Sequence, residues 1–222
     1  MATFADSLFT QDFDYTVPPV KLEKLIAAAK PGDRVLDLGC GAGVLGRELM
    51  HRRLVRSYLG IDVASQALNR ARAAGLTVVR GDVSKRLPVA AGSADLIYAT
   101  EIIEHLFDTD RFVQEIRRVL KPSGRIVFST PNVASLGRRI TLAVGRNPYL
   151  DFAAGPQDVG HIRYFVAANL RELCARNGLQ VTALESDYVN FHISGRWRSR
   201  RLALLFPTLG ASLIAHCRNR SD

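Results

Sequence analysis

Val35-Leu-Asp-Leu-Gly-Cys-Gly-Ala-Gly43 joins a short apolar run directly to the helix predicted over Leu45–Arg52. A buried strand that turns into a helix through glycines lets backbone N–H groups approach a ligand at the helix N-terminus. Gly41, Gly43 and Gly46 also satisfy the pattern G-x-G-x-x-G. That pattern alone indicates either a ligand-binding turn or close packing of the strand against the helix.

Alternating strands and helices flank this stretch. A helix is predicted over Val20–Ala29, because Pro18-Pro19 suits a helix start and Pro31-Gly32 ends the pattern. Beyond the glycines, the predicted strands are Arg34–Leu38, Tyr58–Ile61, Thr77–Arg80, Asp95–Ala99 and Arg125–Thr130, and the predicted helices are Leu45–Arg52, Ser65–Ala73 and Thr109–Leu120. Such alternation predicts an α/β fold with a mostly parallel sheet that helices cover on both faces.

The last third of the chain is less regular. Its predicted elements are a helix over Ala134–Val144, a long loop over Gly145–Gly160, a helix over Ala168–Arg176, and strands over Leu179–Leu184 and Ala211–Cys217. Because no repeat or Gly/Ser linker divides the chain, we treat residues 1–222 as one domain. Its core spans about residues 18–187, and residues 188–222 form a variable basic segment that completes the sheet.

The composition suits a globular protein in a reducing compartment. Hydrophobic residues make up 47% of the chain and charged residues 23%, which provides a full core for one domain. Cys40, Cys174 and Cys217 lie far apart with no C-x-x-C pair, so neither a disulfide framework nor a cysteine zinc site is predicted. Met1–Asp14 has no apolar signal-peptide core, and Leu202–Ala215 is shorter than the roughly 20 residues of a spanning helix. We therefore expect a cytoplasmic protein.

Acidic residues stand at three successive predicted strand ends. Asp37 lies inside the end of the first strand, where a carboxylate would repel a pyrophosphate but could pair with the ammonium of an amino-acid-bearing ligand. Asp62 ends the second strand and can accept hydrogen bonds from both hydroxyls of a ribose. Asp82 ends the third strand and can accept a bond from an adenine amino group. Together the acids favour an adenosyl ligand with a cationic tail over a dinucleotide.

These acids belong to an ordered set of motifs. The set consists of Val35–Gly43, Gly60-Ile-Asp62, Gly81-Asp82, Asp95-Leu-Ile-Tyr98 and Leu120-Lys-Pro-Ser-Gly-Arg125. In this order it resembles the class I S-adenosylmethionine-dependent methyltransferases, and the resemblance covers roughly Val20 to Gly178. It implies a Rossmann-like seven-stranded sheet with an antiparallel last strand and with the cofactor, S-adenosylmethionine, across the carboxyl ends of the first strands.

The resemblance also assigns cofactor-binding residues. They are Asp37, Gly39, Cys40 and Gly41 for the methionine part and the turn, Asp62 with Val63 for the ribose, and Asp82 with Val83 for the adenine. For Cys40 we prefer a small turn residue that contributes its backbone, and for Asp95 a residue that caps or borders its strand. Because the sulfonium of the cofactor already carries an electrophilic methyl group, the protein mainly aligns the acceptor, which contributes roughly 7–11 kcal/mol.

Two carboxylates and a histidine follow the fourth predicted strand, where an acceptor must meet the methyl group. If Glu101 starts a helical turn, Glu104 and His105 share its face. Together with His161, these residues could hold Mg²⁺, Mn²⁺ or Zn²⁺, or His105 could act as a base that Glu101 or Glu104 orients. The pattern is similar to two metal-assisted branches of the family, the ubiquinone-pathway O-methyltransferases and the small-RNA 2′-O-methyltransferases.

Simpler roles remain open for the same residues. Other members of the family that share Glu-His-Leu and His-Ile-Arg-Tyr-Phe have no known metal, and there the residues wall the substrate pocket. His161 could equally close a loop by bonding to backbone. We therefore favour His105 as the base without a metal.

Basic residues concentrate near the C-terminus. From Arg196 to the end there are six arginines and one acid, Asp222, against a net charge of +9 for the chain. The cluster Arg196–Arg201 is either a solvated helix or loop, or, because the apolar Leu202–Pro207 follows, a contact with an anionic membrane. RNA is the weaker interpretation, because the cluster contains only Trp197 as an aromatic platform for bases.

The sequence as a whole predicts a methyltransferase that forms an O-methyl product on a small-molecule, lipid-linked or glycan acceptor. The alternatives are a metal-dependent RNA 2′-O-methyltransferase, a partner subunit that binds the cofactor without catalysis, and a nicotinamide-dependent oxidoreductase. No motif in the loop Gly145–Gly160 or in the tail identifies the acceptor, and nothing sets the oligomeric state.

Overall fold

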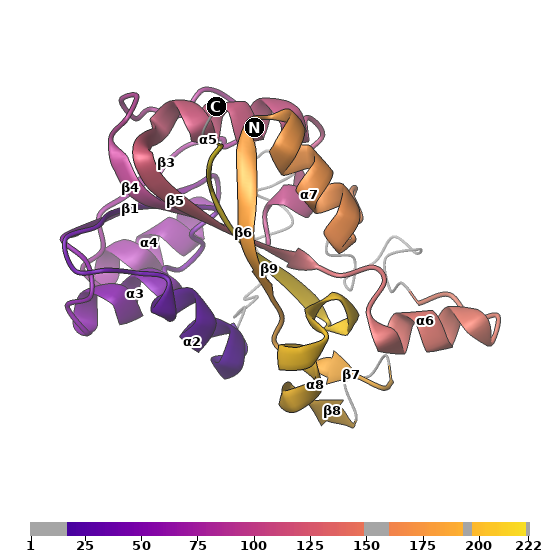
Figure 1. Cartoon of the computed structure of the whole chain (residues 1–222). Coiled ribbons are helices and arrows are strands. Elements are labelled where there is room, and N and C mark those ends of the chain that lie inside the picture. Colours follow the sequence, from indigo (N-terminus) through magenta and orange to yellow (C-terminus); the bar gives the residue numbers. More distant parts are fainter. Residues whose placement is uncertain (1–16, 149–159, 193–196, 221–222) are drawn as a thin grey trace.

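A seven-stranded sheet runs through the part of the chain that the computed structural model describes, which is residues 17–148, 160–192 and 197–220 (Figure 1). In chain order its strands are β1 (Arg34–Leu38), β2 (Ser57–Asp62), β3 (Val78–Arg80), β4 (Ala94–Thr100), β5 (Leu120–Pro131), β6 (Leu179–Glu185) and β9 (Ser212–Asn219). They lie in the order β3-β2-β1-β4-β5-β9-β6. The first five pair in parallel, whereas β9 is antiparallel to both of its neighbours. The predicted Rossmann-like sheet with an antiparallel last strand is confirmed.

Helices cover both faces of the sheet (Figure 1). The α-helices are α2 (Pro19–Ala27), α3 (Val44–His51), α4 (Ser65–Ala73), α5 (Thr109–Val119), α6 (Leu136–Ala143), α7 (Ala167–Arg176) and α8 (Arg200–Leu205), and the 3₁₀ turns are η1 (Ile103–His105) and η2 (Pro207–Leu209). The side chain of Asp108 accepts a bond from Arg111 N and so caps α5, as its sequence predicts. No helix among these described residues is both long and apolar enough to cross a membrane.

The central strands are buried on both faces, so alternate residues enter different cores. In β4, Leu96 and Tyr98 pack with residues of α2, α3 and α4, whereas Ile97 and Ala99 pack with residues of α5 and α7. Tyr98 is fully buried and donates its hydroxyl to Leu25 O at 2.7 Å. Without this bond the core would contain an unpaired hydroxyl, which would lower the free energy of unfolding by about 1–3 kcal/mol.

The structure differs from the predicted elements in β5 and in the last third of the chain. β5 begins at Leu120, ahead of the Pro122-Ser-Gly124 turn, and its register to β4 shifts between Ala94 and Leu96. The basic segment contains a small antiparallel hairpin, β7 (Val189–Asn190) with β8 (Arg198–Ser199), which leads directly into α8. Met1–Asp14, Arg196 and most of the predicted loop Gly145–Gly160 lie outside the described residues.

The carboxyl ends of the parallel strands form the edge where a ligand is expected. Strand order reverses between β1 and β4, and sheets of this type bind ligands in the crevice at that switch point. The turn after β1, the end of β2 and the segment after β4 meet there, so Gly39–Gly43, Asp62 and Glu101 share one edge.

Candidate active site

Hydrogen bonds to β2 position the glycine turn that follows β1. Gly39 N and Cys40 N donate to Ile61 O at 2.8 and 3.2 Å, which ties the turn to the adjacent strand. Gly41 has a φ of +52°, and a Cβ added there would meet no atom within 4 Å. Gly43 has a φ of +76° as the N-cap of α3. The turn therefore borders open space at Gly41 and requires left-handed backbone that glycine adopts without strain.

Asp62 supports this turn with both of its carboxylate oxygens. Gly41 N donates to Oδ2 and Ala64 N donates to Oδ1, each at 2.8 Å. Each carboxylate oxygen has a further lone pair, so Asp62 keeps the capacity to accept bonds from ligand hydroxyls. The structural role of Asp62 is therefore compatible with the predicted binding of a ribose.

Asp37 is a buried carboxylate with one satisfied oxygen. Its side chain lies at the end of β1, is 2% exposed, and accepts a bond from the Tyr58 hydroxyl at 2.8 Å through Oδ2. Within the described part of the chain, Oδ1 has no hydrogen-bond partner. Burial raises the pKa of Asp37 to about 7, although the Tyr58 bond lowers it in part. An unpartnered buried oxygen at the ligand edge fits the ammonium group of an amino-acid-bearing cofactor.

The sequence did not single out Tyr58, yet its position explains a glycine. A Cβ added to Gly46 would lie 2.4 Å from Cζ of the Tyr58 ring. Gly46 therefore makes room for the tyrosine that positions Asp37, so it serves packing rather than ligand contact. The sequence signal for the contact with Asp37 was a tyrosine in a predicted buried strand, because a buried hydroxyl requires a hydrogen-bond partner.

The side chain of Cys40 packs against β2 in the hydrophobic core. It is buried, and a Cβ added to Gly60 would lie 2.6 Å from its Sγ, so the thiol occupies the space beneath that glycine. Burial and the nearby Asp37 raise the pKa of the Cys40 thiol far above its usual range. What Cys40 can offer a ligand is therefore its backbone.

The residues predicted at the adenine lie beyond β3. Asp82 stands two residues after the strand rather than at its end, which corrects the sequence prediction. Partial burial opposes its ionisation, but bonds from Ser84 N and Ser84 Oγ outweigh this effect and lower the pKa of Asp82. Val83 packs in the core, and Val63, next to Asp62, accepts a bond from Arg80 Nε through its carbonyl oxygen.

Glu101 does not start a helical turn, which is a second correction. Its φ is +51°, and the 3₁₀ turn η1 begins two residues later at Ile103. The carboxylate accepts bonds from Lys21 Nζ at 2.5 Å and from Ser129 Oγ at 2.8 Å. Burial opposes ionisation of Glu101, but the nearby charge of Lys21 and its hydrogen bond outweigh burial. The pKa of Glu101 is therefore lowered. Lys21 lies on α2 and is only 2% exposed. A lysine on the apolar face of a predicted helix was the sequence signal for a buried ion pair.

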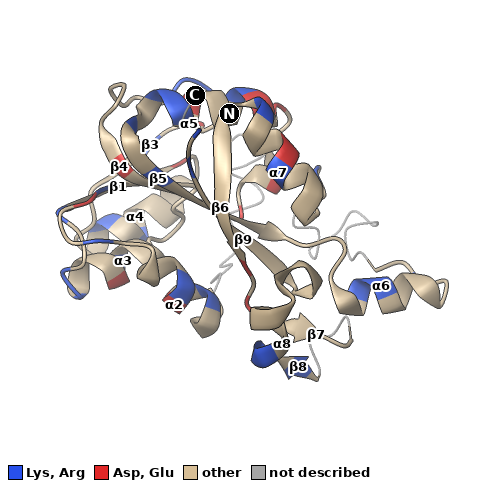
Figure 2. Cartoon of the chain, in the orientation of Figure 1, with Lys and Arg blue, Asp and Glu red and all other residues tan. Residues whose placement is uncertain are grey.

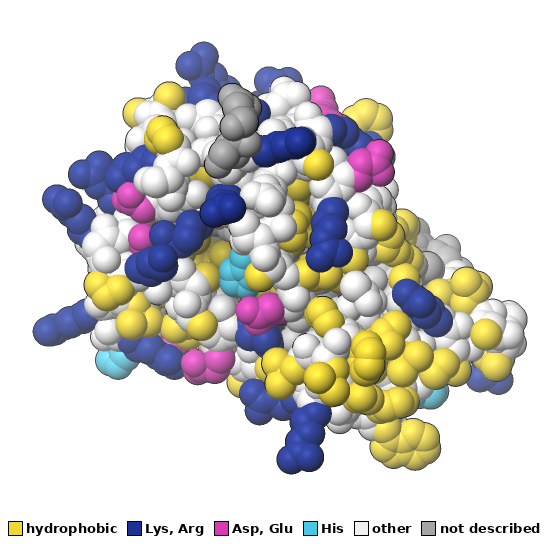
Figure 3. All heavy atoms as spheres, viewed as in Figure 1, with side chains coloured by type: hydrophobic (Ala, Val, Ile, Leu, Met, Phe, Trp, Pro, Cys, Tyr) yellow, Lys and Arg dark blue, Asp and Glu magenta, His cyan; other side chains and the backbone are white. Residues whose placement is uncertain are grey.

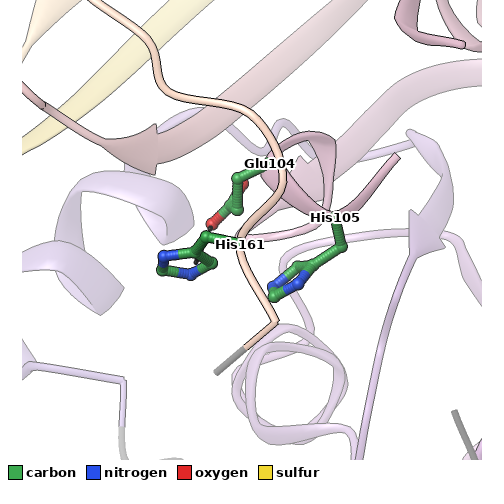
Figure 4. Close-up of side chains that lie close together, drawn as sticks. All are labelled: Glu104, His105 and His161. Atoms are coloured by element: carbon green, nitrogen blue, oxygen red, sulfur yellow. Dashed lines mark ion pairs between the residues drawn. The ribbon is translucent and has the colours of Figure 1, made fainter. Parts of the chain in front are cut away.

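Glu104, His105 and His161 lie close together (Figure 4). Each offers a ligand atom, and these atoms all lie within 4.8 Å of one another. The two imidazole rings are 4.9 Å apart between centroids, and His161 Nε2 is 4.0 Å from Glu104 Oε1. Glu101 is not part of this group, so the structure brings together three of the four predicted residues.

Glu104 is a second buried carboxylate. It is 1% exposed, and neither of its oxygens has a hydrogen-bond partner among the residues described here. Burial, followed by the nearby charge of Glu101, raises the pKa of Glu104 to about 8. A buried carboxylate without a hydrogen bond can receive a proton, a cation or a ligand donor.

Backbone contacts fix the orientation of His105. Its Nδ1 lies 3.1 Å from Gly160 O, and a carbonyl oxygen can only accept, so Nδ1 donates in this arrangement. The lone pair of the neutral imidazole then lies on Nε2. Ile162 N and Arg163 N both donate to Glu104 O at 3.0 Å, so the chain after Gly160 is fastened to η1.

The glycine turn packs against the residue that precedes η1. A Cβ added to Gly39 would lie 3.0 Å from the Ile102 side chain, which immediately precedes η1. Glu104 and His105 are therefore carried on a turn that packs against the glycine turn at the switch point of the sheet. This arrangement suits a reaction between a group held at Asp37 and Asp62 and a group held near His105.

Comparisons with known proteins agree with this geometry. Residues 14–184 match a methyltransferase domain family. A Mycolicibacterium smegmatis protein, named as a probable S-adenosylmethionine-dependent methyltransferase, is 36% identical over 185 residues, which cover 82% of this chain and 62% of that protein. A ubiquinone biosynthesis O-methyltransferase of Neisseria meningitidis is 30% identical over 191 residues, with 81% and 76% covered.

A solved structure shows the same fold. The S-adenosylmethionine-dependent methyltransferase from Mesorhizobium loti has a TM-score of 0.62 and 23% identity, with 88% of this chain and 96% of that chain covered. The present chain spans less than two thirds of the length of the Mycolicibacterium smegmatis relative. The domain match, the relatives and the sheet order together show that the chain belongs to the class I S-adenosylmethionine-dependent methyltransferases.

Proposed function

We propose that the chain methylates a hydroxyl oxygen of a small-molecule, lipid-linked or glycan acceptor, with S-adenosylmethionine as the methyl donor. The observation that carries the proposal is His105, an imidazole whose Nδ1 faces Gly160 O and whose turn packs against the glycine turn. A hydroxyl is a weak nucleophile until its proton is removed, and an oriented imidazole is a suitable general base.

The residues at the edge of the sheet fit the cofactor. Asp37 Oδ1 would receive the ammonium group, Asp62 the ribose hydroxyls, and the open side of Gly41 would border the methionine part. We assign Asp82 and Val83 to the adenine and Val63 to the neighbourhood of Asp62. When bound, S-adenosylmethionine supplies a methyl group on a sulfonium, which is an electrophile with a good leaving group.

The chain's own residues then prepare the acceptor. His105 would take the hydroxyl proton at Nε2, and its bond to Gly160 O would stabilise the imidazolium that forms. Glu104 lies beside both histidines in a buried position, and because its pKa is raised to about 8, it would stabilise that imidazolium with a negative charge only once it is deprotonated. The similarity to a ubiquinone biosynthesis O-methyltransferase supports oxygen as the methylated atom.

The group Glu104, His105 and His161 favours one second candidate, metal-dependent 2′-O-methylation of RNA. One carboxylate and two imidazoles are ligands that Mn²⁺ or Zn²⁺ accepts, and a bound ion would lower the pKa of a coordinated hydroxyl. Loss of activity with a chelator, restored by a divalent ion, together with a steep salt dependence of binding, would favour this candidate. We prefer the proposal without a metal, because Glu101, the second carboxylate of the predicted metal site, is paired with Lys21 and lies outside this group.

Transfer of labelled methyl from S-adenosylmethionine into a cell extract tests the proposed function. After the reaction, the extract is separated into lipid, small-molecule, RNA and protein pools, and the wild type is compared with Asp62→Ala. We expect label in the lipid or small-molecule pool with the wild type alone. Label in RNA would instead support the second candidate. Cofactor binding with no label in any pool, across extracts of several origins, would support a partner subunit without catalysis.

The raised pKa of Asp37 makes cofactor affinity depend on pH. Only the ionised carboxylate attracts the ammonium, so a pKa of about 7 means that protonation competes with binding as the pH falls. Calorimetric titration with S-adenosylhomocysteine should show an affinity about tenfold lower near pH 6 than near pH 8.

Two controls accompany this measurement. Methylthioadenosine, which lacks the ammonium, should bind with little pH dependence. Asp37→Asn should bind S-adenosylhomocysteine weakly at every pH, because an amide carries no charge. An affinity of the wild type for S-adenosylhomocysteine that stays constant over this pH range would contradict the assignment of Asp37.

A further inference from the structure

Large hydrophobic side chains are exposed on two adjoining parts of the chain, α6 with the residues after it and the β7–β8 hairpin with α8. They are Ile140, Leu142 and Val144 on the first part, and Trp197, Leu204, Leu205 and Phe206 on the second. Trp197 is 82% exposed, Leu205 71% and Val144 66%. We call these residues, with the arginines of the same two parts, the basic apolar face. Figure 3 shows hydrophobic side chains gathered in the region of α8 and β7, with basic side chains at the border.

The two parts that form this face carry charge of one sign, and the acids Glu23 and Glu185 line a pocket with Arg200 and Leu204 at its border. The described residues 131–148, 188–192 and 197–206 contain six arginines and no Asp or Glu. Figure 2 accordingly shows basic segments and no acidic ones on α6, β8 and α8. Arg139, Arg146, Arg200 and Arg201 are exposed, and Arg198 lies over the Tyr188 ring at 4.6 Å from its centroid. Positive charge beside exposed aliphatic and aromatic side chains is the composition of a surface that binds anionic lipid.

The two parts form one unit. A Cβ added to Gly137 of α6 would lie 3.0 Å from Asn190 O, so the helix packs closely on β7. Phe191 N donates to Trp197 O at 3.1 Å, which closes the hairpin that leads into α8. The side chain of Ser199 accepts a bond from Leu202 N and caps α8. The exposed side chains are therefore presented on a folded support.

This unit is attached to the carboxyl edge of the sheet, the edge that carries the candidate active site. Asn132, directly after β5, donates from Nδ2 to Thr208 O and Gly210 O at 2.9 and 2.8 Å. Ala211 N donates to Tyr188 O at 2.7 Å, just before β9 begins. A partner that binds the basic apolar face would therefore lie near the same edge of the sheet as His105 and Asp62.

We infer that the basic apolar face docks on the surface of a lipid bilayer that contains anionic lipids. The hydrophobic side chains enter the interface, and the arginines pair with the lipid phosphates. Docking does not depend on the proposed function. Its consequence, that the acceptor is a lipid-linked molecule taken from the bilayer, rests on the proposed function and is tested separately by the label in the lipid pool.

Sedimentation of the full chain with lipid vesicles tests the docking. Vesicles of phosphatidylcholine alone are compared with vesicles that also contain phosphatidylglycerol. We expect the chain to sediment with the mixed vesicles and to be released by raised salt. Each basic residue near an anionic surface changes the partition coefficient roughly fivefold, so Arg200→Glu with Arg201→Glu should lower it at least about 25-fold. Leu204→Ser with Leu205→Ser should also weaken it, because both side chains are exposed and lose apolar contact.

A matched control is available on α4. Arg70 and Arg72 are exposed there, so Arg70→Glu with Arg72→Glu makes the same change of charge on another element and should retain most vesicle binding. All variants should keep the thermal shift with S-adenosylhomocysteine, which shows that they are folded. Docking is overturned if the wild type ignores the mixed vesicles, or if the α4 variant loses as much binding as the α8 variant. A dimer that Leu204→Ser with Leu205→Ser dissociates, without vesicle binding, would assign the face to a second copy of the chain.

Discussion

Asp62→Ala is expected to reduce the affinity for S-adenosylmethionine by at least about 100-fold. Hydrogen bonds to a charged group contribute about 1.5–3 kcal/mol each, and the variant loses the two that the ribose hydroxyls would make. It also releases Gly41 N and Ala64 N, which the two carboxylate oxygens hold at 2.8 Å, so the glycine turn loses its support. Both losses lower the affinity for S-adenosylmethionine. Calorimetric titration and the thermal shift with S-adenosylhomocysteine measure the effect.

Asp95→Ala is the matched control for this change. Asp95 is the second residue of β4, where it accepts bonds from Arg34 N and Lys121 Nζ. Its loss should lower the melting temperature and leave cofactor affinity unchanged. Asp62→Asn should be intermediate, because an amide keeps one acceptor oxygen for the two backbone donors. A folded Asp62→Ala protein that binds the cofactor like the wild type would refute the assignment of Asp62.

The fold could be predicted because its signals are local and agree with one another. Residues 35–38 of β1 are all buried and are apolar except for Asp37, and such short buried runs between amphipathic helices are typical of a covered parallel sheet. The β7–β8 hairpin has strands of two residues, too short to show a period, and it depends on pairing between Val189 and Ser199. α8 could have been found, because Ser199 before an Arg-Arg-Leu run is a typical N-cap.

The candidate site was predictable where strand ends decide it and not where tertiary contacts do. Asp37 and Asp62 follow from the strands that carry them. Glu101 adopts a left-handed φ, which is rare for residues other than glycine, and it turns toward Lys21, a residue 80 positions away in the sequence. No periodicity argument anticipates such a contact. Tyr58 likewise meets Asp37 only because β1 and β2 are neighbours in the sheet.

His105→Ala is expected to lower the turnover rate by about 10²- to 10⁴-fold while cofactor affinity stays unchanged. This range is typical for the loss of a general base. His105 stands on η1 outside the proposed cofactor residues, so its removal should not disturb Asp37 or Asp62. The label incorporated into the acceptor pool measures turnover, and titration with S-adenosylhomocysteine measures affinity. His51→Ala, at the exposed end of α3, is the matched control and should retain both.

The same variant separates a base from a metal ligand. If His105 acts as a base, wild-type activity resists a chelator, and added divalent ions do not change it. If His105 holds an ion with Glu104 and His161, the chelator removes activity, and the divalent ion restores it in the wild type but not in His105→Ala. Full activity of His105→Ala on the acceptor would exclude both roles. Proton removal would then pass to solvent or to the acceptor itself, and methyl transfer would depend on the alignment that η1 and the glycine turn provide.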